Sequence, residues 1–530
     1  MKGHAAIVPL ESALDADHDV IVVGAGHNGL VAALMAARAG LRVLVVERAP
    51  VIGGATRTEY PFTKAPRLPQ STGAYLLGLM PPELMAELEI RIPVLRRDPH
   101  YFLPTTGQRY LLFGSDRAEL ERQFVTFFSR EDWEAEQRLQ AEVAALREDI
   151  APTWLRPPLS IEETAERYVR PALREKFVKL CRGSVGEYLE GFGFESDLVK
   201  AMYAVTDGFS GLYGSYDTPG TGMNFLIHNL CRLPGSDGTW MIVEGGMGTV
   251  ARVLADGLAQ HGGRIVVGRQ VKSILIEQGA ARGVVLEDGT ELLSRAVIVN
   301  ADPFRLQGLI GRERLPDEYN QRLDRLRRPG STFKLNLALR ALPKFTCLPE
   351  NRGQFGPTIH LLPEAGDVIG ELRRAFASVE AGKLSDFPTI EWYVHSTVDP
   401  SLSDPEGHIS AAFFVQWVPY ELAESSWDVE GDRYARRLLE VADRFAPGTS
   451  DLVVDWQVLH PKRIEEHFGI TYGHIHHVDN GFGFSDRVPH ETPVSGLYSA
   501  SAGTHPAGSV IGCAGYLAAK RCFADLGLVH

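Results

Sequence analysis

Short apolar runs bounded by glycine-rich turns recur along the chain, and they predict buried strands. Near the N-terminus, residues 20–23 are continuously apolar, which is typical of a strand buried on both faces. Residues 30–39 are rich in Ala and Leu and predict a helix that Gly40 ends. Residues 42–47 predict a second buried strand. This strand–helix–strand order favours an α/β layer.

The middle of the chain repeats this pattern and then changes character. A helical pattern covers residues 116–200, with helices at 118–128 and 130–150. A further helix at 249–260 precedes strand-like runs at 264–267, 271–276, 281–286 and 295–301. Residues 333–340 alternate apolar and polar side chains, which predicts a half-exposed strand. Further strands are expected at 389–395 and 408–417, and helices at 433–444 and from about 515 to 526.

The turn after the first strand carries a nucleotide-binding pattern, Gly24-Ala-Gly26-His-Asn-Gly29. Gly24 allows a tight turn, Gly26 lets the backbone approach a pyrophosphate, and Gly29 lets helix and strand pack closely. The helix N-terminus supplies free N–H groups for phosphates. Glu47 ends the second strand 21 positions beyond Gly26, where it would accept hydrogen bonds from a ribose. The carboxylate favours FAD or NAD over NADP.

Two further glycine-rich stretches extend this pattern. The Gly53-Gly54 doublet permits close approach to a second part of the same ligand, which an extended FAD needs and NAD does not. Arg57 is either a flavin or phosphate contact or a solvated side chain. Near the C-terminus, residues 503–515 join a short strand to a helix start. Free N–H groups there would stabilise negative charge on a reduced flavin, although a glycine-rich packing corner would have the same composition.

Composition restricts the class of protein. The chain has 530 residues, 44% of them apolar, and a net charge of −13, which argues against a nucleic-acid partner. No run of 18 apolar residues is present, so no segment is expected to span a membrane. Residues 1–16 lack the features of a secretory signal, and we expect them to form a loose tail. The five cysteines form no close redox or zinc pattern, which indicates reduced thiols, no metal site and a cytoplasmic location.

The segment between Ser71 and Leu95 is strongly apolar and has two interpretations. Tyr75, Leu79, Met80 and Leu84 could form a membrane-peripheral entrance for an apolar substrate. More commonly, such a segment is the core between two domains. The sequence alone leaves both interpretations open.

Several motifs in one chain order resemble those of the phytoene desaturase-like FAD-dependent oxidoreductases. They are the N-terminal fingerprint with its Gly doublet, Gly245-Gly246-Met-Gly248, Asn300-Ala-Asp-Pro303 and Gly503-Thr-His-Pro506. Leu79-Met-Pro-Pro-Glu-Leu84, Val398-Asp-Pro400 and Phe445-Ala-Pro-Gly448 extend the resemblance over nearly all of residues 19–525.

The resemblance implies a bound FAD and a specific set of contacts. Because no His or Cys lies in a recognisable flavin-attachment motif, we expect the FAD to be bound non-covalently. FAD would contact Gly24, Gly26, Gly29, Glu47, Arg48, Gly53, Gly54, Ala55, Thr56, Arg57, Val271, Gly503, Gly508, Ser509 and Val510. Within this set, Val271 would meet the adenine through its backbone. Ala55 stands where the family often has Arg, so that a charge near the flavin is missing or comes from Arg57. His505 is a candidate catalytic residue near the flavin, although a His before Pro is more often structural.

The resemblance also implies a two-part architecture. We expect an α/β fold: a Rossmann-like FAD-binding domain of the amine oxidase and phytoene desaturase type, with an inserted α+β substrate domain. The FAD-binding domain would comprise residues 17–75, 240–305 and 470–530. The substrate domain, with its helical part, would comprise residues 76–239 and 306–469.

Two classes of function follow from this resemblance. The first is an FAD-dependent oxidoreductase acting on a hydrophobic, polyene or isoprenoid-like substrate such as a carotenoid, by desaturation or by flavin-dependent isomerisation. No paired-carboxylate or Ser/His/Asp pattern is evident, and His474, His476 and His477 have no assigned role. The second class is a flavin-retaining interaction protein with little catalysis. An apolar tunnel reaching the flavin would favour the enzyme, and a closed pocket would favour the interaction protein.

Overall fold

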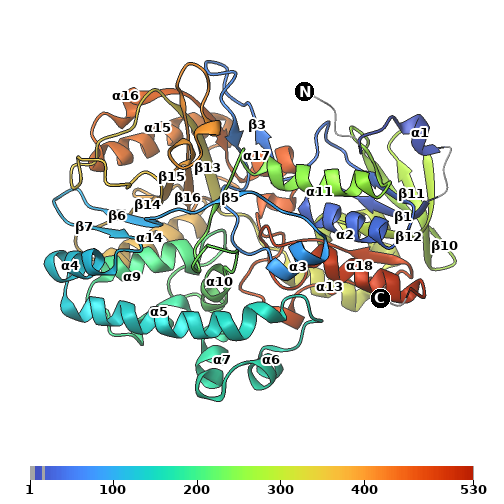
Figure 1. The fold of residues 1–530 in the computed structure, drawn as a ribbon, viewed down its shortest axis with the longest axis horizontal. Helices are drawn as coiled ribbons and strands as arrows, with labels where there is room; N and C mark the ends of the chain where they lie inside the picture. The colour runs from blue at the N-terminus through green and yellow to red at the C-terminus, as the bar shows by residue number, and fades with distance from the viewer. Residues whose placement is uncertain (1–5, 15–17, 529–530) are drawn as a thin grey trace.

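The computed structural model describes residues 6–14 and 18–528, and its strands form two large sheets. Figure 1 shows the sheets in two lobes, the first sheet at the right and the second at the left. The first sheet has the order β10-β11-β12-β1-β2-β9, with β18 also paired to β12. Its strands are β1 His18–Val23, β2 Val43–Val46, β9 Arg264–Val266, β10 Val271–Glu277, β11 Ala280–Leu286, β12 Glu291–Val299 and β18 Leu497–Ser499.

The centre of the first sheet is parallel, as its continuously apolar strands predict. β1 pairs in parallel with β2 and β12, and β18 adds to β12 from the far end of the chain. Three helices pack together on one face of this sheet: α2 His27–Arg38, α11 Gly248–Gln260 and α18 Cys513–Asp525. The α/β Rossmann-like fold expected from the sequence is therefore confirmed.

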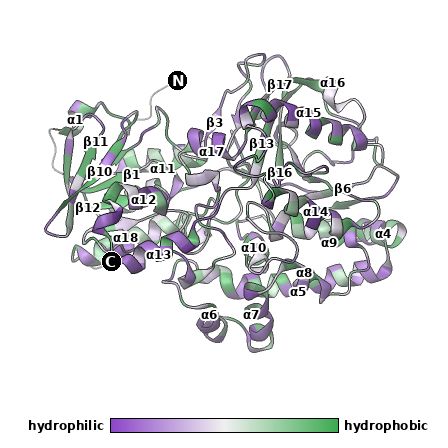
Figure 2. Cartoon of the chain, turned by 180° about the vertical axis from the view of Figure 1, so that it is seen from behind, coloured by the Kyte–Doolittle hydropathy of each residue, from purple (hydrophilic) through white to green (hydrophobic). Residues whose placement is uncertain are grey.

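The second sheet is mostly antiparallel and has the order β17-β13-β16-β15-β14-β6-β7. Its strands are β6 Tyr101–Pro104, β7 Tyr110–Phe113, β13 Thr332–Leu339, β14 Thr358–Leu361, β15 Thr389–Val394, β16 Ile409–Gln416 and β17 Val453–Leu459. Alternate residues such as Leu335, Trp392 and Phe413 pack with the long helix α15 Trp427–Phe445 on one face. In Figure 2, α15 carries many purple, hydrophilic residues, while the strands of the first sheet are largely green.

The remaining helices lie around the two sheets (Figure 1), and many of them fall in the predicted 116–200 region. They are α1 Leu10–Leu14, α3 Pro82–Glu87, α4 Arg117–Phe127, α5 Arg130–Ile150, α6 Ile161–Tyr168, α7 Arg174–Arg182, α8 Val185–Glu190, α9 Asp197–Tyr203, α10 Thr221–His228, α12 Pro303–Ile310, α13 Asp317–Leu326, α14 Val368–Glu380, α16 Thr449–Leu452 and α17 Pro461–Phe468. Two-residue strands pair as β3 Thr58–Glu59 with β4 Gln70–Ser71, and as β5 Val94–Leu95 with β8 Ile242–Val243. Within the described residues, every helix is too short or too polar to span a bilayer.

Two expectations from the sequence are wrong. β13 is not half-exposed, because all eight of its residues are buried. The described part of the N-terminal segment is not loose, because Ile7 bridges to Ile265 and α1 follows it. Within the apolar segment between Ser71 and Leu95, Leu79 and Met80 are buried in the two main hydrophobic clusters, whereas Tyr75 lines the cavity described below.

Candidate active site

The glycine turn after β1 has the geometry that its sequence predicts. Gly24 has a φ of +97°, in the region that favours glycine. A Cβ on Gly29 would lie 2.1 Å from the Gly24 carbonyl oxygen, so that only glycine allows α2 to approach the strand. Gly26 caps α2 without a side-chain acceptor, which leaves the first N–H groups of the helix free for an anion.

Glu47 stiffens the same turn from the end of β2. One carboxylate oxygen, Oε2, accepts a hydrogen bond of 2.7 Å from the Ala25 N–H. The other, Oε1, accepts a hydrogen bond of 2.8 Å from the Ala49 N–H. The side chain is buried, and each carboxylate oxygen keeps a second lone pair for a ligand hydroxyl.

One cavity of about 550 Å³ begins at this turn and ends on the second sheet, within the volume range of ligand pockets. The part near the first sheet is lined by the glycine-rich segments and by longer polar side chains, among them Glu47, Arg57 and Arg305. The inner part is an aromatic chamber, by which we mean the part of the cavity lined by Tyr75, Leu76, Tyr101, Trp240, Tyr393, Phe414 and Ile475. A single cavity therefore joins the nucleotide-binding turn to a mainly apolar chamber.

Most of the predicted contact residues line this cavity. They are Gly24, Gly26, Glu47, Arg48, Gly53, Gly54, Ala55, Thr56, Arg57, Val271, Ser509 and Val510. Gly29, Gly503 and Gly508 do not line it; they lie behind the wall. A Cβ on Gly508 would lie 2.4 Å from the backbone and Cβ of His476, which does line the cavity, so this glycine allows the two segments to pack closely.

Arg57 is not the solvated side chain that one interpretation of the sequence allowed. Its guanidinium is buried and donates to the carbonyl oxygens of Gly54 at 2.6 Å and His467 at 3.2 Å. It also lies 5.2 Å from the ring centroid of Phe468. Because Arg57 is held on the cavity wall, it can supply the positive charge that Ala55 lacks.

His505 does not occupy the position expected of a catalytic residue. It is absent from the cavity lining, and its buried ring packs 5.8 Å from the ring of Phe484. Burial lowers the pKa of His505 to about 3, so the ring is neutral. The histidines without an assigned role are better placed, because His476 and His477 both line the cavity.

The aromatic chamber contains two buried ionisable side chains that no sequence motif pointed to, Lys334 and Glu391. The ammonium nitrogen of Lys334 lies 4.2 Å from the ring centroids of both Tyr75 and Phe414. Burial lowers the pKa of Lys334 to about 7. Burial likewise raises the pKa of Glu391 to about 8. Behind the wall, burial raises the pKa of Asp207 to about 7.

Lys334 and Glu391 lie on strands that the sequence predicts. Lys334 of β13 and Glu391 of β15 both pair with Phe414 of β16, so all three lie on one face of the second sheet. Of the polar residues of β13, Lys334 lines the cavity, whereas Asn336 is buried and accepts hydrogen bonds from Gln70 and Tyr75. Sequence alternation distinguishes the two faces of a strand, but it does not distinguish solvent from an internal cavity.

The residues near the first sheet fit FAD. The free N–H groups at α2 provide a phosphate site, and Glu47 stands at the ribose position. A Cβ on Gly53 would lie 2.7 Å from the Thr56 carbonyl oxygen, and its φ is +113°, so this second turn also requires glycine. The Nε2 atom of His27 and the Oδ1 atom of Asn28 are buried and have no hydrogen-bond partner among the described residues. The cavity continues from this cradle toward the chamber, as an extended dinucleotide requires.

Comparison with known proteins agrees with this geometry. Residues 29–371 match the family described as flavin containing amine oxidoreductase. The chain is 32% identical to pyridine nucleotide-disulfide oxidoreductase domain-containing protein 2 of Rattus norvegicus, over 97% of this chain and 94% of the relative. It is 25% identical to one of the subunits of limonene dehydrogenase from Castellaniella defragrans, over 96% and 95% of the two chains. It is 26% identical to prolycopene isomerase 1 of an Oncidium hybrid cultivar, over 97% and 85%.

Solved structures share the fold at low identity. An oxidoreductase from Methanosarcina mazei aligns with a TM-score of 0.59 and 19% identity, covering 96% of this chain and all of the other (100%). Putrescine oxidase bound to putrescine aligns with a TM-score of 0.60 and 14% identity, covering 97% and 100%.

Proposed function

Because the chain belongs to the flavin-containing amine oxidoreductase family, we propose that it desaturates an apolar, isoprenoid-like substrate held in the aromatic chamber. Membership of this family makes the chain an FAD-dependent oxidoreductase. The proposal about its substrate rests on the single cavity that runs from the Glu47 turn to the chamber. This continuity supports an enzyme over a flavin-retaining interaction protein, for which a closed pocket would be expected.

The names of two relatives support the substrate class. Limonene and prolycopene are both unsaturated isoprenoid hydrocarbons, and the relatives named for them match over 96% and 97% of this chain. The chamber walls suit such a molecule, because Tyr75, Trp240 and Phe414 present aromatic surface to it. The same relatives leave isomerisation as the alternative reaction, since one of them is named an isomerase.

The chemistry divides between the cofactor and the chain. FAD, when bound, supplies a two-electron acceptor for a C–H bond. The chain orients the substrate between aromatic side chains and excludes water from it. Because the pKa of Lys334 is lowered to about 7, a large fraction of its amino groups is neutral near pH 7.5. The Lys334 Nζ atom can therefore accept the proton that must leave the substrate when a double bond forms.

Anaerobic incubation of the FAD-loaded protein with a panel of polyenes tests this function. Flavin bleaching together with a product two hydrogens lighter supports desaturation, and an isomer of unchanged mass indicates the isomerase. Reduction of the flavin only by small polar amines or acids would refute both. Lys334→Met serves as the matched variant, because it should retain FAD while losing turnover.

A further inference from the structure

Glu391 has an unused hydrogen-bonding atom at the floor of the aromatic chamber. Its side chain lines the cavity and is 2% exposed. The Tyr393 hydroxyl donates to Oε2 at 2.6 Å, whereas Oε1 is buried and has no hydrogen-bond partner among the described residues. Buried polar atoms are nearly always paired, so an unpaired atom on a cavity wall indicates a ligand atom that completes it.

The protonation state of Glu391 determines whether the ligand atom is a hydrogen-bond donor or acceptor, and it depends on the surrounding charges. The titratable and charged groups that face it from the packed elements are Tyr393, His360, Lys334, Arg97, Asp207 and Tyr101. Burial and, to a lesser extent, the Asp207 carboxyl raise the pKa of Glu391 to about 8, while the hydrogen bond from Tyr393 and the charges of Lys334 and Arg97 act in the opposite direction. At neutral pH the carboxyl is therefore mostly protonated. Since Oε2 accepts from Tyr393, the proton belongs on Oε1, and Glu391 offers a donor to the cavity.

Lys334 offers a second donor on the same sheet face. Both residues pair with Phe414, which places their Cα atoms roughly 10 Å apart across two strand spacings. The Lys334 amino group lies over aromatic rings and donates no hydrogen bond to any other residue in the described parts of the chain. Two such donors, with the charged Arg97 nearby, suit an acceptor oxygen. A substrate ammonium would meet the cationic Arg97, a partly protonated Lys334 and a neutral acid.

We propose that Glu391 and Lys334 form a subsite that holds a carbonyl oxygen of the substrate. The inference rests on the proposed function and narrows it: the apolar substrate is a ketone, aldehyde or ester rather than a pure hydrocarbon or an amine. The aromatic chamber receives the apolar part, and the subsite fixes which end of the molecule enters first. Hydrogen bonds from both donors orient the substrate along the sheet floor.

Equilibrium dialysis of three matched probes against the FAD-loaded protein under anaerobic conditions tests the subsite. The probes are 7,8-dihydro-β-ionone, the hydrocarbon in which CH₂ replaces its carbonyl, and the primary amine at the same carbon. The wild type should bind the ketone at least tenfold more tightly than the other two. Glu391→Leu should remove most of this preference without weakening hydrocarbon binding. Glu391→Gln should retain it, because the amide still donates.

The pH dependence separates donation from a purely structural role. Between pH 7 and 9.5 the ionisation of Glu391 should weaken ketone binding to the wild type, whereas the Glu391→Gln variant should lose less affinity. FAD content and melting temperature identify a variant that has failed to fold. Equal binding of ketone and hydrocarbon by the wild type, tightest binding of the amine, or identical pH profiles in wild type and Gln variant would overturn the proposal. If the ketone binds tightly and this binding depends on Glu391, but no product two hydrogens lighter forms, the proposed desaturation is refuted while the proposed subsite is supported.

Discussion

Removal of the Glu47 carboxylate should weaken FAD binding by roughly tenfold to a hundredfold. The carboxylate is 8% exposed and accepts hydrogen bonds of 2.7 and 2.8 Å from the N–H groups of Ala25 and Ala49. A hydrogen bond to a charged group contributes about 1.5–3 kcal/mol. Loss of the one bond expected from the ribose hydroxyl therefore lowers affinity by about one to two orders of magnitude. Loss of the two internal bonds should also lower the melting temperature of the apoprotein.

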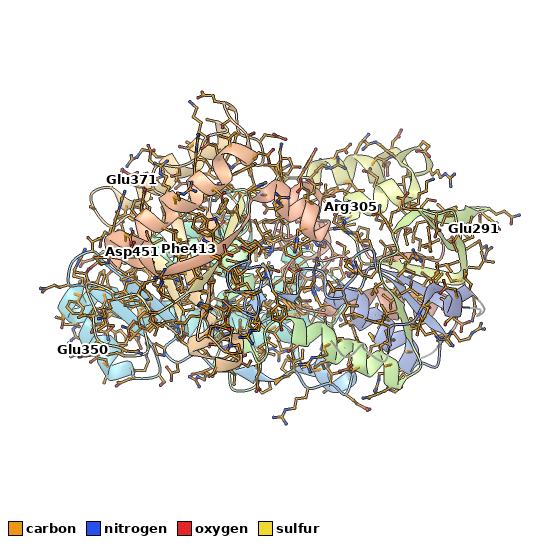
Figure 3. All side chains as sticks on the ribbon, turned by 90° about the horizontal axis from the view of Figure 1, so that it is seen from above. Glu291, Arg305, Glu350, Glu371, Phe413 and Asp451 are labelled. Atoms are coloured by element: carbon orange, nitrogen blue, oxygen red, sulfur yellow. The ribbon has the colours of Figure 1, made fainter. Side chains whose placement is uncertain are left out.

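Three variants separate these two effects. Glu47→Ala removes every acceptor, whereas Glu47→Gln keeps the side-chain volume and one acceptor oxygen, so its affinity for FAD should be intermediate. Glu291→Ala removes an exposed carboxylate of β12 in the same sheet, and Figure 3 shows this side chain at the far edge of the molecule. That control should bind FAD like the wild type.

Titration of the apoproteins with FAD, followed by quenching of flavin fluorescence, measures the affinities. Wild-type affinity in Glu47→Ala would refute the assignment of this carboxylate to the ribose. A drop in Glu47→Ala that equals the drop in Glu291→Ala would show that the loss of a negative charge from the domain, rather than the specific contact, is responsible.

The remaining predictions concern packing, charge and electron source. Gly29→Ala should weaken FAD binding more than tenfold in a fluorescence titration, because its Cβ would lie 2.1 Å from the Gly24 carbonyl oxygen. The control Gly431→Ala in α15, whose Cβ would lie 3.6 Å from its nearest atom, should bind FAD like the wild type. Lys334→Met should raise the melting temperature more at pH 6.5 than at pH 10, because below its pKa of about 7 the buried lysine carries an unfavourable charge in the folded protein. The same rise in melting temperature at both pH values would contradict this prediction. The same variant should turn over at least about a hundredfold more slowly. NADPH should not bleach the flavin within milliseconds in a stopped-flow experiment, because the sequence has one complete dinucleotide fingerprint.

The first sheet and its nucleotide site could be predicted because their determinants are local. Strand, turn, helix, strand and acid all lie between residues 18 and 47, and each part has a recognisable chemical reason. Gly29 and Gly53 are required by contacts within the same short segments or with nearby Thr56. Such local constraints can be recognised in the sequence without knowledge of the rest of the fold.

The chamber could not be predicted in this way, because its residues meet only through strand register. Lys334 and Glu391 are 57 positions apart in the sequence and meet across Phe414, and Tyr75 and Tyr101 come from other parts of the chain. The position of His505 depends likewise on long-range packing against Phe484. A local motif next to the flavin-end glycines therefore suggested a catalytic role that the cavity lining does not support.

The polar floor of the chamber also changes what the family resemblance implies about the substrate. A hydrocarbon gains nothing from a buried lysine and a buried glutamic acid, and burying such groups without partners destabilises the fold. Their retention beneath the aromatic walls is explained if the substrate pairs with them when it binds. In the proposed function, the apolar lining would provide affinity for an isoprenoid-like chain, and Glu391 and Lys334 would orient it. If the proposed subsite is right, substrate specificity depends on the polar side of β13 and β15, which in the sequence is indistinguishable from an ordinary exposed strand face.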